Sequence, residues 1–348
     1  MATYEPVKST PRLDPIWALG KKFLGSELPI MCGAMTWISD PKLVSKVSNM
    51  GGFASLAGGN MPPEMFSDTI DETRRLTDRP FAANIIVIAP NYRAQLDICC
   101  EKKMSHIVFA GSIPRQSDVE QAKDSGAKVV CFASTASIAE RMIAYGADAL
   151  VLEGSEAGGH IGHVSTIVLL QDILFSYGDK LPIFVAGGIA HGGMIGHLLL
   201  MGAAGVQLGT RFVVAEECQA HPKFKEAFIK ARSREAISTP QYSHKLPVVA
   251  VRALKNRAMD RFGELQMELL QKLASGEINR QEAQFKVEEY WVGSLREGAV
   301  DGDVDKGSLM AGQSVGLIRK VQPLREILQQ LVDEADLAVA GAARRLEA

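Results

Sequence analysis

The sequence predicts an α/β fold, a (β/α)8 TIM barrel with a helical addition near the C-terminus, and three observations support it. Short apolar runs alternate with helix-favouring segments eight times between residue 28 and about residue 215. The runs are apolar throughout, which is typical of parallel strands buried on both faces. Eight such units in roughly 190 residues fit a closed barrel. A doubly wound open sheet is the alternative, but no GxGxxG motif opens a helix after the first run.

The expected strands and helices follow one another along the chain. We expect strands at 28–35, 51–58, 81–89, 106–111, 128–133, 148–154, 182–188 and 205–210. We expect helices between them at 40–50, 63–76, 91–103, 116–126, 136–146, 164–178 and 192–202. Residues 1–217 would then form the barrel.

After residue 217 the pattern changes. Helices with charged faces are expected at 221–236, 251–275 and 279–295, with no strand between them. We therefore expect residues 218–300 to form a helical addition over the mouth of the barrel. Residues 301–348 are expected to form a glycine-rich loop followed by a long amphipathic helix that packs back on the barrel.

The composition restricts the classes of function. Of the 348 residues 47% are hydrophobic and 22% charged, with a net charge of −2, so we expect a globular protein without a nucleic-acid partner. No apolar run reaches about 18 residues and the N-terminal segment is polar, so we expect no membrane span, no secretory signal and a cytoplasmic location. Five cysteines without metal-ligand spacing predict reduced, mostly buried thiols, no iron–sulfur cluster and no structural zinc.

The segment EGSEAGGHIGH, residues 153–163, follows the sixth expected strand. In a (β/α)8 barrel the loops after the strands form the active face. His160 lies there in a flexible, glycine-bordered turn where backbone can approach a ligand, and an imidazole suits proton transfer near neutral pH. A structural or solvated histidine is the alternative. The position between glycines at a strand end favours catalysis, and we predict His160 as the catalytic residue.

Two further glycine-containing loops follow the seventh and eighth expected strands. Gly187 and Gly188 lie in the first loop, and Gly209 and Thr210 in the second. At these positions of a barrel, backbone N–H groups and a helix N-terminus often bind phosphate, and glycine leaves room for the anion. We predict a phosphate site on these four residues, for ligands that range from phosphosugars to flavin mononucleotide (FMN).

Other polar residues of these loops are expected to have supporting roles. We expect His163 to lie near the start of the following helix. His191 and His197 are expected to cap or face the helix after the seventh strand. Arg211 is expected to pair with the phosphate or with an internal carboxylate.

Several segments resemble the nitronate monooxygenase (2-nitropropane dioxygenase) superfamily. They are EGSEAGGHIG, AGGIAHGG, GVQLGTRFVVAEE and GDVDKGSLMAGQ. Within it the chain is most similar to the flavin-dependent enoyl-acyl-carrier-protein reductase II branch, through GAMTWI, AGGNMPPE, AHPKFKEAFIKAR and VRALKN. The similarity runs from residue 29 to about residue 318. The segment FAGSIPRQ, 109–116, departs from the family's glycine-rich loop, so the wall on the substrate side is expected to differ.

The resemblance implies a (β/α)8 barrel that holds non-covalent FMN. It places the flavin ring beside Gly33, Ala34, Met35, Thr36, Asn84, Glu153, Gly158, Gly159 and His160, with Gln313 reaching back to the same site. It places the phosphate on Gly187, Gly188, Gly209 and Thr210, the residues that the loop pattern already indicates. No metal ligand is implied.

The resemblance also implies the reaction. As a reductase of fatty acid synthesis, the enzyme is expected to use NAD(P)H to reduce a trans-2-enoyl thioester, with His160 as the donor to the thioester oxygen or the acid at the α-carbon. The alternative is a nitronate monooxygenase that oxidises alkyl nitronates with O2 and needs no NAD(P)H. A non-catalytic flavin- or phosphate-binding protein is a third class, which an intact His160 beside an intact phosphate site disfavours.

An acyl carrier protein is an expected partner of the reductase, because it is acidic and the chain offers a basic segment. That segment carries Lys223, Lys225, Lys230, Arg232 and Arg234. A solvated helix face is the alternative interpretation of the same charges. A homodimer is compatible with the resemblance.

Overall fold

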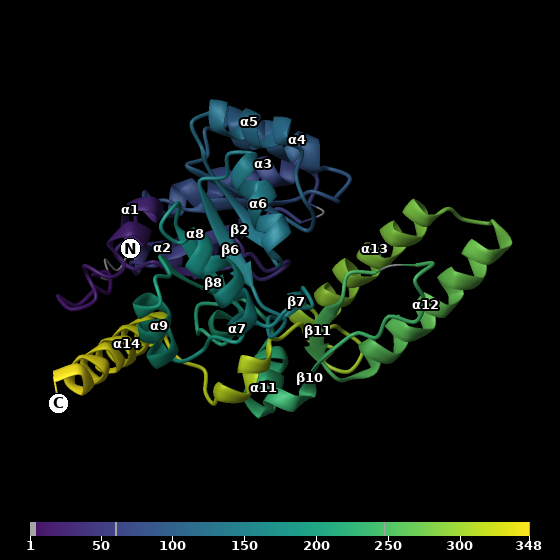
Figure 1. Ribbon diagram of the computed structural model, residues 1–348. Helices are drawn as coiled ribbons and strands as arrows, with labels where there is room; N and C mark the ends of the chain where they lie inside the picture. Colours follow the sequence, from purple (N-terminus) through teal and green to yellow (C-terminus); the bar gives the residue numbers. More distant parts are fainter. Residues whose placement is uncertain (1–4, 60, 247, 348) are drawn as a thin grey trace.

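The computed structural model describes residues 5–59, 61–246 and 248–347, and in it eight parallel strands close into a barrel (Figure 1). The barrel strands are β1 (Ile30–Cys32), β2 (Phe53–Ala57), β3 (Ala82–Ile86), β4 (His106–Ala110), β5 (Lys128–Ala133), β6 (Ala149–Glu153), β8 (Ile183–Ala186) and β9 (Gly205–Leu208). Each pairs in parallel with the next, and β9 pairs with β1 to close the barrel. The predicted TIM barrel and its eight strands are confirmed.

Helices cover the outside of the barrel. They are α2 (Pro41–Asn49), α3 (Pro63–Leu76), α4 (Tyr92–Glu101), α5 (Gln116–Asp124), α6 (Ala136–Ala144), α7 (Thr166–Leu169), a π-helical turn η1 (Leu170–Leu174), α8 (Phe175–Tyr177), α9 (Gly192–Leu200) and α10 (Thr210–Val213). Helix α1 (Ala18–Leu24) precedes β1, and its Phe23 and Leu24 join the apolar core inside the barrel. The helix predicted at 164–178 is observed as one continuous helical segment over 166–177, with the π-helical turn in its middle.

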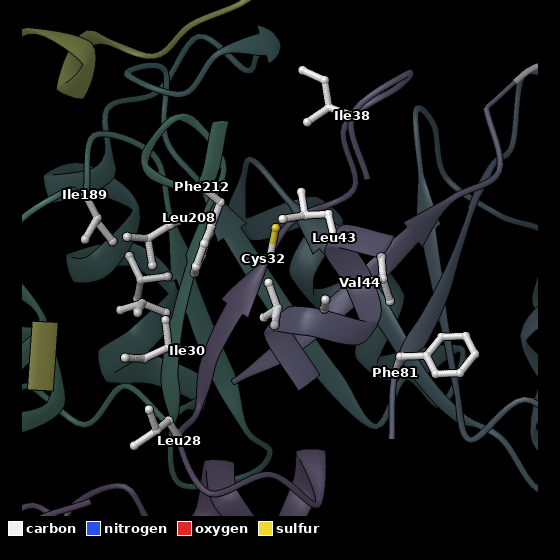
Figure 2. Close-up of a cluster of buried hydrophobic side chains, with 14 of the residues drawn as sticks. Leu28, Ile30, Cys32, Ile38, Leu43, Val44, Phe81, Ile189, Leu208 and Phe212 are labelled. Atoms are coloured by element: carbon white, nitrogen blue, oxygen red, sulfur yellow. The ribbon is translucent and has the colours of Figure 1, made fainter. Parts of the chain in front are cut away.

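Two apolar clusters explain why the strand sequences are apolar throughout. Met31 of β1 belongs to the cluster inside the barrel, whereas its neighbours Ile30 and Cys32 belong to the larger cluster between the strands and the helices. Figure 2 shows part of the outer cluster, in which Cys32 lies beside Leu43 of α2. Successive side chains of a strand point to opposite faces, and here both faces are buried.

The helical addition contains two strands that the sequence analysis missed. Its elements are α11 (Pro222–Lys230), a 3-10 turn η2 (Ser233–Glu235), β10 (Ala236–Ser238), β11 (Val251–Leu254), α12 (Arg257–Ser275) and α13 (Arg280–Ala299). The prediction of helices without strands between them was wrong, because β11 pairs with β10 on one side and with β7 (Gly159–His160) on the other. These long-range pairings decide the structure of a segment whose local pattern favours a helix.

Helices α12 and α13 form a hairpin that extends away from the barrel (Figure 1). The addition has its own small apolar core, which includes Val251 of β11, Phe262 of α12, and Val287 and Trp291 of α13. This core is separate from the two clusters of the barrel, whereas α11 packs into the outer cluster of the barrel through Phe224 and Phe228. The α12–α13 hairpin is therefore the part of the addition that forms a layer of its own.

The C-terminal part of the chain returns to the barrel through a 3-10 turn η3 (Gln313–Leu317) and α14 (Leu324–Glu347). Helix α14 lies against α9 (Figure 1). The backbones approach so closely that a Cβ on Gly192 would lie 2.1 Å from the carbonyl oxygen of Leu331.

None of the helices among the described residues combines the length and the apolar character that a membrane span requires. Residues 1–4 and 348 of the predicted divisions lie outside the described residues.

Candidate active site

A cavity of about 1300 Å³ lies between the carboxyl ends of the barrel strands and the helical addition. Its floor consists of residues at the ends of the barrel strands, and its roof includes one face of α13 together with Met310, Gly312 and Ser314. Pockets for drug-sized ligands measure about 300–1,000 Å³, so this cavity has room for two ligands side by side. All the predicted site residues except Gln313 line it.

His160 faces the cavity, but it does not lie in a flexible turn. With Gly159 it forms β7, and it is paired with Val251 of β11. Its Nε2 atom lies 3.2 Å from Oε1 of Glu288 on α13, which is the distance of a hydrogen bond. The expectation of a mobile loop was wrong because the strand pairing holds the backbone. The catalytic role of His160 stays a prediction.

Glu153 ends β6 and faces the cavity from the floor. Burial raises the pKa of Glu153 to about 8. Desolvation is the only cause of this pKa shift, so no cation among the described residues offsets the burial of the carboxyl group. At neutral pH the carboxyl group is therefore mostly protonated, and it can donate its O–H to a ligand as well as accept a hydrogen bond.

Gly187 and Gly188 adopt backbone conformations that require glycine. Their φ angles are +99° and +72°, in the left-handed region that is unfavourable for residues with a Cβ. Gly209 differs, since its φ is −112° and an added Cβ would meet only the sulfur of Met35, at 3.6 Å. The protein itself therefore leaves the space above Gly209 open, as a ligand that approaches this backbone would need.

The N-terminus of α9 is not free to bind phosphate. The Nδ1 atom of His191 accepts from Gly193 N at 2.9 Å, which confirms the predicted cap. The carboxylate of Glu334, from α14, accepts from Gly192 N at 2.7 Å. A phosphate in this cavity would therefore rely on the amides of loop 187–188 and on the start of α10 at Thr210.

Two predicted basic groups are buried and bind protein atoms. Arg211 donates to Oε1 of Gln322 at 2.8 Å and to Oε1 of Gln330 at 3.2 Å, so it pairs with neither a phosphate nor a carboxylate. Burial lowers its pKa from the usual value. Lys225 donates to the carbonyl oxygen of Ala215 at 2.6 Å. It is buried, so it is not part of a basic face for an acidic partner.

The remaining predicted residues lie on the floor or beside the roof. Gly33, Ala34, Met35, Thr36, Asn84, Gly158 and Gly159 line the cavity. No other described residue forms a hydrogen bond with the amide group of Asn84, which leaves the amide for a ligand. Gly158 is also required by packing, since a Cβ there would lie 2.5 Å from Gly312 N. Gln313 does not line the cavity, and its backbone N–H donates to the carbonyl oxygen of Glu156.

Sequence reasoning missed several residues of the cavity. Gln207 of β9 lines the floor next to Gly33, and a polar residue inside the apolar run GVQLGT was a usable signal. Glu288, Trp291 and Val292 of α13 line the roof. No local signal distinguishes them, because α13 carries charged and apolar residues along its whole length.

The comparisons with known proteins agree with this geometry. A sequence model of the family described as nitronate monooxygenase matches residues 18–95 and 86–334. The chain belongs to the nitronate monooxygenase family. It is an FMN-dependent oxidoreductase of that family.

Similar proteins carry several different names. A "(3aS,4S,5R,7aS)-5-hydroxy-7a-methyl-1-oxo-octahydro-1H-indene-4-carboxyl-CoA dehydrogenase" of Mycobacterium tuberculosis is 27% identical over 336 residues, covering 90% of this chain and 94% of that protein. A probable nitronate monooxygenase of Staphylococcus aureus is 25% identical over 359 residues, covering 90% of this chain and 96% of that protein. The structure of FabK from Thermotoga maritima is 33% identical with a TM-score of 0.83, covering 97% of this chain and 99% of that one.

The residues present fit FMN. The open space above Gly209 fits a phosphate, and the left-handed glycines of loop 187–188 line the same cavity. The free amide of Asn84 and the neutral carboxyl group of Glu153 offer donors and acceptors to the polar edge of a flavin. The volume of the cavity is sufficient for this cofactor together with a substrate.

Proposed function

We propose that this protein uses NAD(P)H to reduce the carbon–carbon double bond of a 2-enoyl thioester. The observation that carries the proposal is the size of the cavity, about 1300 Å³, together with the apolar residues in its lining, which would leave room for an acyl chain beside a flavin. Ile86, Ile88 and Ile113 form one apolar wall, and Val292 and Leu295 of the roof lie in the same cavity. An acyl chain would bury apolar surface there, whereas a small alkyl nitronate would leave most of the space unfilled.

Two of the similar proteins support a reaction on an acyl thioester. FabK, an enoyl-acyl-carrier-protein reductase II, has 33% identity and covers 97% of this chain. The name of the relative from Mycobacterium tuberculosis describes a coenzyme A thioester, which is the other common carrier of acyl groups. The carrier for this protein is therefore proposed to be a thioester of coenzyme A or of acyl carrier protein.

Residues of this chain would bind the cofactor, supply a proton and shield the reaction from water. When bound, FMN would supply hydride-transfer chemistry between a nicotinamide and the β-carbon of the substrate. The loop amides of Gly187, Gly188 and Gly209 would hold its phosphate. His160, across the cavity, would supply the proton that the α-carbon needs, or a hydrogen bond to the thioester oxygen. The apolar walls exclude water and strengthen these polar contacts.

An anaerobic assay tests the proposal. The purified holoenzyme is mixed with NADH or NADPH, and oxidation of the nicotinamide is followed with and without 2-enoyl thioesters of coenzyme A and of acyl carrier protein. We expect oxidation that depends on the thioester and yields the saturated acyl product. Oxygen uptake with propyl-2-nitronate, without nicotinamide and without enoyl-dependent turnover, would instead establish the nitronate monooxygenase activity that the family name describes.

A further inference from the structure

Two hydrogen bonds tie one face of α13 to the rim of the barrel. His160, after β6, pairs through Nε2 with Oε1 of Glu288 at 3.2 Å. Trp37, in the loop after β1, donates from Nε1 to the carbonyl oxygen of Val292 at 2.9 Å. Residues four positions apart lie one above the other on a helix, so both contacts are made by the same face of α13. The roof is therefore fastened at two points beside the cavity.

Trp37 makes its contact with α13 from an unfavourable backbone conformation, which indicates that the surrounding structure holds it in place. Its φ is +66°, and the left-handed region is rare for a bulky residue. Strained backbone of this kind persists only where the surroundings hold it, and such residues gather at functional sites. Here the strain places an exposed indole where it reaches the roof helix.

The pairing with Glu288 determines which nitrogen of His160 can serve the substrate. A carboxylate oxygen accepts hydrogen bonds, so this pairing forms with the tautomer in which Nε2 of His160 carries the hydrogen. Among the described residues, no other group forms a hydrogen bond with the imidazole. The nitrogen that remains is Nδ1, and it is the atom able to exchange a proton inside the cavity.

A role in positioning His160 accounts for this geometry better than a role in stabilising the fold. The side chains of His160 and Glu288 are 35% and 22% exposed, and partly exposed pairs contribute little to stability. Both residues line the cavity, and within the described chain Glu288 forms its ion pair with His160 and not with a lysine or an arginine. The pair lies in the cavity proposed to bind the substrate, and a proton-transfer residue oriented by a carboxylate is a common arrangement in enzymes.

We infer that Glu288 is a positioning residue for His160, and that it fixes the imidazole so that Nδ1 faces the reacting carbon. Trp37 holds α13 at the height at which Glu288 reaches the imidazole. The inference rests on the proposed function only in assigning His160 to proton transfer, and it applies equally to an enoyl thioester or a nitronate. The roof helix thereby supplies a part of the catalytic apparatus that the barrel lacks.

A double-mutant cycle tests whether Glu288 acts through His160. The variants are Glu288→Ala, Glu288→Gln, His160→Ala and the His160→Ala/Glu288→Ala pair, with Glu289→Gln, at an exposed position of the same helix, as the control. We expect Glu288→Ala to lower kcat by roughly 10-fold with little change in KM, and Glu289→Gln to have no effect. In the His160→Ala background, the further loss caused by Glu288→Ala should be less than about 2-fold. Equal losses in both backgrounds would overturn the inference.

A second measurement does not depend on turnover. Diethyl pyrocarbonate modifies accessible imidazole nitrogens, and mass spectrometry of the holoenzyme gives the rate at each histidine. We expect Glu288→Ala to accelerate modification of His160 several-fold, Trp37→Phe to accelerate it less, and Glu289→Gln to leave it unchanged. An unchanged rate in Glu288→Ala overturns the pairing. If the wild type reduces no enoyl thioester, the proposed function fails while this result still decides the inference.

Discussion

Replacing Glu153 by glutamine should make the flavin-free protein more stable at neutral and alkaline pH. The substitution keeps the size of the side chain and its ability to form hydrogen bonds, but it removes the ionisable group. Burial raises the pKa of Glu153 to about 8 in the folded protein, whereas the ordinary value of about 4.5 applies to the unfolded chain. The folded protein therefore keeps a proton that the unfolded chain releases.

The direction and size of the effect follow from this difference. Below about pH 4.5 the carboxyl group is protonated in both states and causes no pH dependence. Between about pH 4.5 and 8 this carboxyl group ionises only in the unfolded chain, so the contribution of Glu153 lowers the free energy of unfolding by about 1.4 kcal/mol per pH unit. Over this whole pH range Glu153 lowers the free energy of unfolding by roughly 3–5 kcal/mol. The lower end of the range applies if water in the cavity partly solvates the carboxylate. Above pH 8 both states are ionised and the penalty is constant.

Urea unfolding of both proteins, after removal of flavin, measures the effect at several pH values from 5 to 8.5. The difference in free energy of unfolding between Glu153→Gln and the wild type should grow steadily over this range. The exposed variant Glu289→Gln is the control, and its difference from the wild type should not depend on pH. A Glu153→Gln difference that is constant from pH 5 to 8 would show that the carboxyl group ionises normally, and it would refute the reasoning.

Three further predictions concern the site and the barrel. His160→Ala should retain FMN but slow enoyl reduction by roughly 100-fold, and turnover at the wild-type rate would reject its role. Gly209→Ala should leave stability unchanged within about 0.5 kcal/mol, because a Cβ there meets only Met35. Its FMN affinity, measured by flavin fluorescence, should fall by roughly 10-fold or more, and an unchanged affinity would place the phosphate elsewhere. Burial lowers the pKa of His106 to about 4, so the contribution of His106 to stability should fall by up to roughly 3 kcal/mol as the pH falls from 6.5 to 4. In urea unfolding, the free energy of unfolding of His106→Gln relative to the wild type should therefore rise by this amount over the same range, and a difference that stays constant would contradict the lowered pKa.

The barrel could be predicted because its strands are buried on both faces. Met31 faces the interior while Ile30 and Cys32 face the helices, so each position must be apolar. The sequence carries this requirement locally, as a continuous apolar run. The same local information placed loops 187–188 and 209–210 at one rim, because the carboxyl ends of parallel strands meet there.

The strands of the addition could not be predicted in the same way. The segment 251–254 is continuous with a helical pattern, and it becomes β11 only because β7 and β10 supply partners. The partner residues Gly159 and His160 lie far away along the chain. A window of local sequence contains no information on such a pairing, so the mobile turn expected for His160 proved to be a fixed strand.

Several polar contacts of the site are equally non-local. Glu288 lies 128 residues from His160, and Arg211 lies 111 residues from its acceptor Gln322. The residue types suggested plausible partners for Arg211, a phosphate or a carboxylate, but burial beside α14 selected glutamines instead. The N-terminus of α9 was similarly taken by Glu334 of α14.

The sequence by itself determined the closed barrel, the rim at which the predicted site residues meet, and the glycine-containing loops at that rim. These properties depend on side-chain periodicity and on backbone freedom, which act over a few residues. Only the tertiary structure decided which groups face His160, which cations are buried, and how far the roof lies from the floor. These depend on contacts between segments distant in the chain, whose stability comes from packing that no single segment encodes.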